Sequence, residues 1–186
     1  MPNLFLARTF NFQISLFLAP AAVAGSAPSG ATSGGAEATL VDGAFQECSG
    51  LDIEMDVQDH LEGGRNDGVI RRVGRAKYQQ LVLKRGMFYN TGGAQRAGEK
   101  VDSKLWIWFQ DVVSGKRPVP RYNGIIDVLD LPNQPGAGLV AASPVARWAF
   151  ERGLPAKLVG PQLNARTGEV AIEELHIAHE GLRLVV

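Results

Sequence analysis

The sequence predicts a mainly β fold that carries one main α-helix. In several segments, above all 9–18 and 51–58, apolar and polar residues alternate, and this two-residue period is typical of a half-buried strand. Only the segment 103–115 combines apolar residues at helical spacing with residues that start and stop a helix. The 22 glycines and 10 prolines separate these segments and mark the loops between them.

The first predicted strand covers residues 9–18, and a second interpretation competes with it. Arg8 precedes an apolar stretch that ends in small residues near Ala24, which is the pattern of a signal peptide. A secretory apolar core is continuous, whereas this segment alternates strictly. The alternation therefore favours a strand, whose apolar positions are Phe10, Phe12, Ile14 and Leu16.

Three strands and one loop are predicted in the next part of the chain. The segments 51–58, 69–73 and 78–85 are rich in apolar and β-branched residues, and Gly74 is a candidate bulge between the last two. Residues 62–68 are dense in glycine, asparagine and aspartate, which tolerate positive φ. An exposed loop is therefore expected there.

One helix is predicted, with Ser103 as its N-cap and Gly115 at its C-terminal stop. Trp106 and Val113 widen its apolar stripe, so we expect the helix to pack on a sheet with little exposed face. The central buried stripe consists of Leu105, Trp108, Phe109 and Val112.

The chain length suits one domain, expected to span residues 1–186. Later strands are predicted at 125–129, 145–150 and 170–177. Flexible or decorating insertions are predicted at 19–36, 87–101 and 132–144.

Composition argues against several classes of function. The formal net charge is zero, which disfavours a general nucleic-acid coat and a binder of anionic membranes. The single cysteine, Cys48, leaves no internal disulfide framework. No apolar run reaches the roughly 18 residues of a transmembrane helix, so no membrane insertion is expected.

Charge is nevertheless distributed unevenly. Every formal charge in residues 47–62 is acidic, and every one in residues 68–98 is basic. If the two segments pair as a hairpin, opposite charges face each other across it. Either the hairpin is solvated and its charges compensate internally, or acidic and basic surfaces of neighbouring copies meet. The candidate subunit contacts are Asp52, Glu54, Asp56, Asp59, Arg71, Arg72, Arg75 and Lys77.

The sequence predicts no metal or cofactor site. His176 and His179 point to opposite faces if they lie in a strand, and no cysteine or third histidine lies nearby in sequence to complete a zinc site. Residues 93–100 approach a phosphate-binding loop, but Glu99 stands where that motif needs lysine. No cofactor is therefore expected.

Nor does the sequence predict catalytic residues. Cys48 has no neighbouring cation to lower the pKa of its thiol, so a small buried residue is the better interpretation. Glu173 and Glu174 alternate across a predicted strand and are expected at the surface. We therefore expect a protein that is not an enzyme.

A series of short segments in a fixed order gives a further indication. They are 10–12, 45–51, 62–64, 77–78, 83–86, the helix with Leu105, Trp106 and Trp108, then 146–150, 155–157, 160–165 and 170–182. In this order they resemble the tail-tube family of contractile phages and phage-like extracellular injection systems. The resemblance covers most of the chain outside the predicted insertions.

The resemblance implies a small β-barrel or sandwich flanked by a helix, closing into hexameric rings that stack into a hollow inner tube. The implied partners are other copies of the chain, a sheath protein, baseplate and spike proteins, and cargo or nucleic acid in the lumen. It also implies assembly in the cytoplasm of the producing cell and then a place in a virion or a phage tail-like particle. The hairpin contributes to the lumen wall, and the implied ring-to-ring contact is Glu62, Gly63, Gly64, Arg65, Asn66, Asp67 and Gly68.

Other functions stay open at this point. The three insertions are longer than the family pattern, so a tube-initiating or baseplate-adaptor ring between spike and tube is an alternative to the main tube subunit. The signal-like N-terminus gives mild support to a secreted β-barrel that binds a small ligand. A hydrolase has no visible triad to support it.

Overall fold

The computed structural model describes residues 11–20, 39–43, 45–64, 67–87, 102–129, 144–166 and 168–185. The predicted insertions at 19–36, 87–101 and 132–144 fall almost wholly outside the described residues, as do Arg65 and Asn66 and the phosphate-loop candidate at 93–100.

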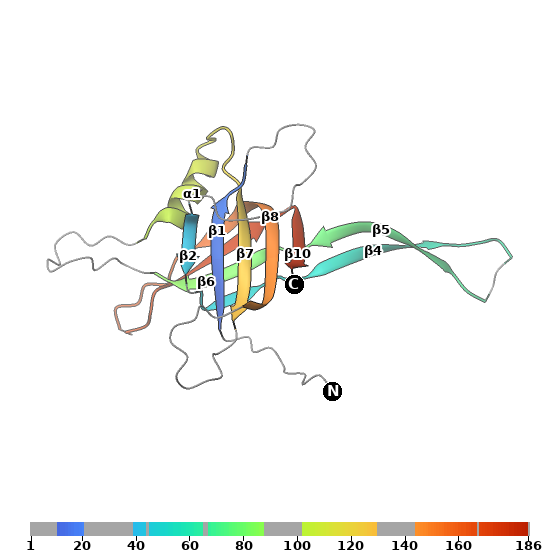
Figure 1. Ribbon diagram of the computed structural model, residues 1–186, viewed down its shortest axis with the longest axis horizontal. Coiled ribbons are helices and arrows are strands. Elements are labelled where there is room, and N and C mark those ends of the chain that lie inside the picture. Colours follow the sequence, from blue (N-terminus) through green and yellow to red (C-terminus); the bar gives the residue numbers. More distant parts are fainter. Residues whose placement is uncertain are drawn as a thin grey trace.

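The described chain forms ten strands and one helix, so the prediction of a mainly β fold with one helix is confirmed (Figure 1). In chain order they are β1 (Phe12–Leu18), β2 (Thr39–Gly43), β3 (Glu47–Ser49), β4 (Ile53–His60), β5 (Ile70–Tyr78), β6 (Leu81–Gly86), α1 (Lys104–Val113), β7 (Tyr122–Leu129), β8 (Pro144–Val159), β9 (Ile172–Ala178) and β10 (Gly181–Val185).

One long strand joins two layers of antiparallel sheet. The strand order is β2-β1-β7-β8-β9-β6-β3, with β10 also paired to β8. The part of β8 up to Gly153 pairs with β7 and β10, and the part from Leu154 pairs with β9. Arg152, just before this change of partner, has a positive φ of 53°. The result is an open sandwich in which β2, β3 and β10 each pair on one side only within the described residues.

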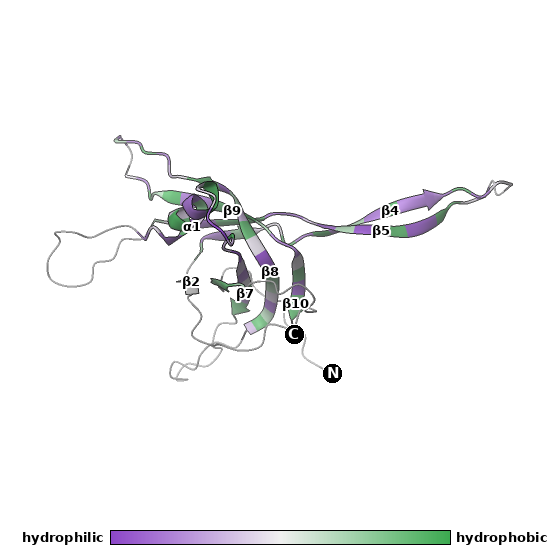
Figure 2. Ribbon diagram, turned by 90° about the horizontal axis from the view of Figure 1, so that it is seen from above, coloured by the Kyte–Doolittle hydropathy of each residue, from purple (hydrophilic) through white to green (hydrophobic). Residues whose placement is uncertain are grey.

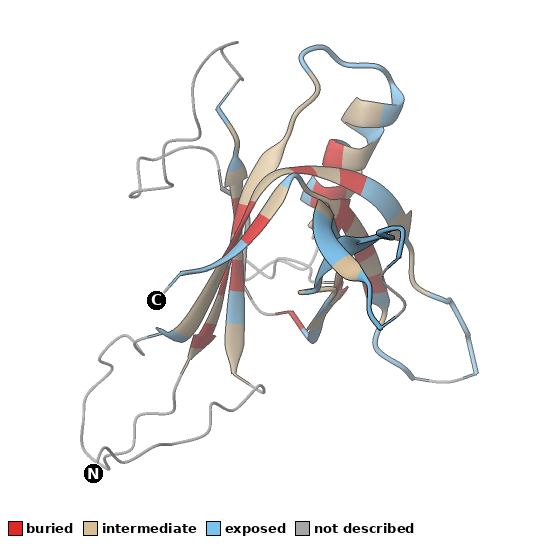
Figure 3. Ribbon diagram, turned by 90° about the vertical axis from the view of Figure 1, so that its right-hand side faces the viewer, coloured by how far each residue is buried: buried red, intermediate tan, exposed pale blue. Residues whose placement is uncertain are grey.

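The core lies between these layers and under the helix. Alternate residues of β1, β7, β6 and β9 point inward, as the two-residue period of a strand requires. Figure 3 shows buried residues on both layers and on α1. The largest fully buried apolar side chains include Ile14, Leu16, Ile126, Phe150, Leu81, Leu83, Leu175, Ile177 and Leu105, joined by Trp108.

A glycine makes room for the aromatic ring of Phe150 in this core. A Cβ added at Gly124 would lie 2.1 Å from Cε1 of Phe150, which is far inside any real contact distance. Gly124 on β7 pairs directly with Phe150 on β8. The glycine is therefore needed so that the ring can lie flat across the neighbouring strand.

The predicted bulge is present, although it interrupts one strand instead of separating two. Met55 pairs with Ala76 and Val57 with Val73, so Asp56 faces both Gly74 and Arg75. A Cβ at Gly74 would lie 2.7 Å from the carbonyl oxygen of Asp56. Strand β5 continues through this bulge to Tyr78, whereas the sequence predicted a break there.

Some strands were missed or shortened in the prediction. The predicted strand 145–150 is only the first part of β8, which extends to Val159. Strands β2, β3 and β10 were not predicted as separate elements. The predicted first strand is confirmed as β1 from Phe12, and residues 9–10 lie outside the described residues.

Candidate assembly surfaces

The hairpin β4–β5 projects far from the two layers (Figure 1). Every residue of β4 is exposed, and so are most residues of β5. Its two strands pair with each other and form a separate two-stranded sheet. A two-stranded ribbon is at best marginally stable alone in water, so we expect contacts with another chain to stabilise this hairpin.

The two faces of the hairpin differ in chemistry. Pairing brings Ile53 opposite Tyr78, and Val57 opposite Val73, and side chains two apart on one strand share a face. The other face carries Glu54 opposite Lys77. The exposed apolar face consists of Ile53, Met55, Val57, Val73, Ala76 and Tyr78, and Figure 2 shows hydrophobic and hydrophilic residues mixed along both strands.

The predicted facing of opposite charges holds at two positions. Glu54 pairs with Lys77 and Asp59 with Arg71, where Nε lies 3.7 Å from Oδ1. These side chains are exposed, and such pairs are worth about 0–1 kcal/mol each. Of the remaining charges in one copy, Asp56 faces Gly74 and Arg75 at the bulge, Arg72 opposes Gln58, and Asp52 precedes β4.

The predicted contact loop lies at the free end of the hairpin (Figure 1). Glu62, Gly63 and Gly64 continue from β4, and Gly64 adopts the positive φ of 90° expected of a turn glycine. Asp67 and Gly68 lead back into β5. The loop is therefore exposed, as the sequence predicted, and it is remote from the core.

The helix packs on the sheet through a narrower stripe than predicted. Leu105 and Trp108 are buried, Val112 packs against the core, and Phe109 is only partly buried. Val113 is 73% exposed, so the expectation that it widens the buried face is wrong. The Ser103 side chain makes no capping hydrogen bond. Instead, the Asp102 carboxylate accepts from the backbone N–H of Lys104 at 3.2 Å, outside the predicted cap.

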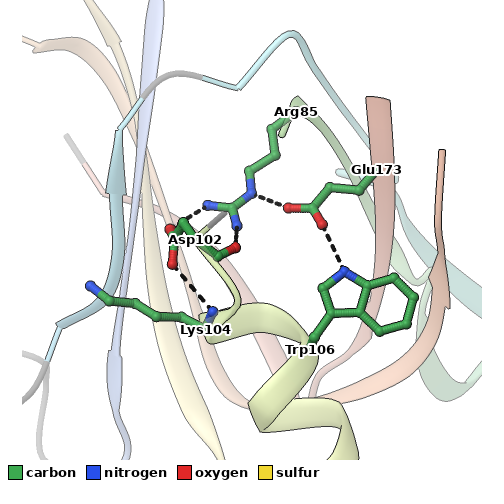
Figure 4. Close-up of polar contacts among 5 residues, drawn as sticks. All are labelled: Arg85, Asp102, Lys104, Trp106 and Glu173. Atoms are coloured by element: carbon green, nitrogen blue, oxygen red, sulfur yellow. Dashed lines mark hydrogen bonds and ion pairs between the residues drawn. The ribbon is translucent and has the colours of Figure 1, made fainter. Parts of the chain in front are cut away.

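A buried ionic network links α1 to strands β6 and β9 (Figure 4). Arg85 on β6 donates from Nε to Oε1 of Glu173 on β9 at 2.5 Å, and the Trp106 indole donates to Oε2 at 3.0 Å. Nη1 of Arg85 also lies 3.3 Å from Oδ2 of Asp102, just before the start of α1. Both carboxylate oxygens of Glu173 are therefore hydrogen bonded, which is the condition for burying such a charge.

This network corrects one prediction about the glutamate pair. Glu173 and Glu174 do alternate across β9, but only Glu174 is on the outer face, where it lies 2.6 Å from Nε2 of His176. Glu173 shares the inner face with Leu175 and Ile177 and is buried. The burial of Glu173 could not be predicted from its neighbours in sequence, because its ion-pair partner Arg85 lies 88 positions away in the chain.

The other polar candidates show no catalytic geometry. Burial, with a smaller contribution from Glu47, raises the pKa of the Cys48 thiol to about 11, so the thiolate is scarce at neutral pH. The His179 ring lies between Tyr78 and Phe150, with centroids 5.5 and 5.8 Å away. Its ring nitrogens are shielded from solvent and lack well-formed hydrogen bonds.

No group of three or more potential metal ligands exists among the described residues. In the same part of the chain, no helix has the length and apolar character to cross a membrane. The features that stand out are instead a mainly β sandwich, a helix held by buried hydrogen bonds, and an amphipathic ribbon that pairs with no other strand of the described chain. These are the features of a structural protein that assembles with other chains.

Comparison with known families agrees with this class. Residues 8–183 match the model of the family described as T4-like virus tail tube protein gp19, and the chain belongs to this family. The resemblance to tail-tube proteins is thereby confirmed, and the chain is a structural tail tube protein. A comparison with curated proteins found no match.

Solved structures show the same fold at low sequence identity. A chain of the anti-feeding prophage (AFP) baseplate, 6-fold symmetrised, has a TM-score of 0.66 and 21% identity, covering 98% of this chain and 97% of that one. The PVC extracellular contractile injection system, as its sheath-tube complex in the extended state, gives 0.65 and 17%, with 97% and 92% covered. Its sheath/tube terminator gives 0.62 and 16%, with 98% of both chains covered.

Proposed function

We propose that this chain is the main subunit of an inner tube, in which hexameric rings stack inside a contractile sheath. One observation carries the proposal: the hairpin β4–β5 exposes an apolar face that the described chain leaves uncovered except at Tyr78, whose ring contacts His179. A copy of the same chain supplies a cover, and repetition around an axis closes a ring. The 6-fold symmetry stated for the similar AFP baseplate structure supports a hexamer.

The hairpin has edges suited to adding strands from neighbours. Within the described residues β4 pairs only with β5, so each strand keeps one open edge. The formal charges of β4 are acidic and those of β5 are basic, so β4 of one copy placed beside β5 of the next brings opposite charges together. The contacts proposed here are Asp52, Glu54, Asp56, Asp59, Arg71, Arg72, Arg75 and Lys77.

The two faces of the hairpin then have different environments. The apolar face, with Ile53, Val57 and Val73, packs against protein, because burial removes it from water. The face with Glu54 and Lys77 remains in water and lines the lumen through which cargo or nucleic acid passes. A sheath surrounds the outside, baseplate and spike proteins hold one end, and assembly takes place in the cytoplasm before the particle is released.

A tube-terminating or baseplate-adaptor ring is the second candidate. It is favoured by the similarity to a chain of the AFP baseplate and to the PVC sheath/tube terminator. A main subunit polymerises without limit through two complementary ends, whereas an adaptor or terminator stops after one ring. The two functions therefore differ in how far the purified chain stacks.

Electron microscopy of the purified chain, over a range of concentrations, tests the proposal. Tubes many rings long support the main subunit, and single rings support the adaptor or terminator. A monodisperse monomer at high concentration would contradict both. Mass spectrometry of the N-terminus adds a check on the secreted alternative, because removal near Ala24 would take away β1.

A further inference from the structure

A second exposed apolar surface lies between β8 and β9, on the described residues 160–166 and 168–171, here called the arm. In the arm Leu163 is 89% exposed and Val170 is 75% exposed. Single exposed apolar side chains are common, but Val159 and Ile172 at the two ends of the arm are exposed as well. Leu163 and Val170 in the arm, with Val159 and Ile172 beside it, therefore indicate a contact surface.

The arm is anchored to the body at both of its ends. The backbone N–H of Met87 donates to the carbonyl of Ala171 at 2.8 Å, and Gly160 lies against the Trp106 indole. Within the arm, the Asn164 side chain accepts from the backbone N–H of Arg166 at 3.0 Å, which stabilises a turn. The arm therefore presents Leu163 beyond the body.

The arm and the hairpin lie at opposite ends of the same layer. Strand β6 follows the hairpin with Leu81, which pairs with Ile177, and ends at Gly86, which pairs with Ile172 beside the arm. Both Figure 1 and Figure 2 show the hairpin and the arm at opposite ends of the long axis. Neither surface can therefore cover the other within one copy.

The free end of the hairpin, like the arm, exposes apolar side chains. We call residues 61–69 the hairpin end, of which Arg65 and Asn66 are not described. Its strand-side residues Leu61 and Val69 are both exposed apolar side chains, and Leu61 is 77% exposed. It also carries the carboxylates of Glu62 and Asp67, and the arm carries both the guanidinium of Arg166 and the carboxylate of Glu169.

We propose that the arm of one copy receives the hairpin end of a second copy in the adjacent ring. This inference rests on the proposed tube function and names the receiving surface of the ring-to-ring contact. Two different surfaces at opposite ends form a head-to-tail contact, which repeats without closing and so extends a stack. In this contact Leu61 and Val69 pack against Leu163 and Val170.

Two double variants and a control test this contact by electron microscopy and light scattering. The arm variant is Leu163→Ser with Val170→Ser, the hairpin-end variant is Leu61→Ser with Val69→Ser, and the control is Val113→Ser, an equally exposed apolar position on α1. Each double variant is expected to form rings but to lose stacking at least about tenfold, because the apolar contact is removed. The control is expected to stack like the wild type.

Mixing the two double variants gives a sharper readout. Rings of the arm variant keep an intact hairpin end, and rings of the hairpin-end variant keep an intact arm. A mixture is therefore expected to give pairs of rings and nothing longer. In a Cys48→Ala background, Leu61→Cys combined with Leu163→Cys is expected to form a disulfide between copies upon oxidation, whereas Leu61→Cys combined with Val113→Cys is not.

The outcomes separate this inference from the function on which it rests. Wild-type chains that form no ring at all would overturn both. Wild-type stacks together with normal stacking of the arm variant would overturn the arm as the receiving surface and leave the tube function standing. The same conclusion follows if the mixture gives no paired rings, or if the cysteine pair at positions 61 and 163 does not cross-link in assembled tubes.

Discussion

Arg85 and Glu173 form an ion pair inside the protein, with 2.5 Å between Nε and Oε1 and with 4% and 1% of their side chains exposed. The pair links two neighbouring strands and, through Trp106 and Asp102, the start of the helix. Replacing Glu173 by alanine leaves a buried guanidinium facing only the partly exposed carboxylate of Asp102. We expect Glu173→Ala to destabilise the fold by about 3–5 kcal/mol.

Urea unfolding of the variant, followed by tryptophan fluorescence, measures this loss. Glu174→Ala on the opposite face is the matched control and is expected to cost far less, because its contacts are near the surface. Equal losses in the two variants would show that the buried pair has no special role.

Gly124→Ala is expected to destabilise the protein by about 1–3 kcal/mol through overpacking against Phe150. Gly181→Ala, where an added Cβ meets no atom within 4 Å, is the control. Combining Gly124→Ala with Phe150→Leu should cost less than the sum of the two single changes, because the smaller side chain leaves room for the new methyl. Additive losses in thermal unfolding would contradict the proposed clash.

Acid is expected to weaken the contact between the hairpin root and the core. Burial is the main reason that the pKa of His179 lies below its ordinary value, with nearby backbone groups of Gly181 and Gln79 opposing the shift. Between the unfolded pKa of about 6.5 and the lower folded one, the unfolded chain binds more protons. Stability should therefore fall as the pH drops below about 6.5.

His179→Phe keeps the ring contacts with Tyr78 and Phe150 and removes the titration. Unfolding free energies measured on both chains from about pH 7.5 to pH 5 should differ in slope. Identical slopes would assign the pH dependence to other groups.

Charge reversal in the hairpin tests the proposed contacts between copies. Arg71→Glu with Arg72→Glu should weaken association more at low than at high ionic strength, because salt screens exposed charges beyond about 10 Å at 0.1 M. Lys104→Glu, an exposed charge on the helix, controls for the change of sign. An association that is indifferent to salt would rule out charge complementarity between β4 and β5.

Cys48 gives a simple chemical check of the fold. Its pKa of about 11, caused first by burial, predicts slow alkylation by iodoacetamide at about pH 8. The unfolded chain in urea should react about a hundredfold faster if reaction follows the thiolate fraction. Equal rates in the two states would contradict the burial of this thiol.

Much of the fold could be predicted because its signals are local. The alternation at Ile53, Met55 and Val57 predicted a strand, and the spacing of Leu105 and Trp108 predicted the helix; both are confirmed. The ordered series of short segments also identified the family, which the match over residues 8–183 confirms.

Features that depend on distant residues could not be predicted in this way. Strand β8 continues through Gly153 and Pro155, residues that usually interrupt strands, because its partner changes there from β7 to β9. The burial of Glu173 requires Arg85 from another strand. Strands β4 and β5 stand apart from the sandwich because all the other described strands pair among themselves. No local sequence pattern predicts this separation.

Strand β8 has a mechanical consequence for the subunit. Because one continuous backbone of 16 residues belongs to both layers, a load applied to one layer reaches the other through covalent bonds. The layers cannot slide past each other without bending this strand, so the subunit resists shear even where its side-chain contacts yield.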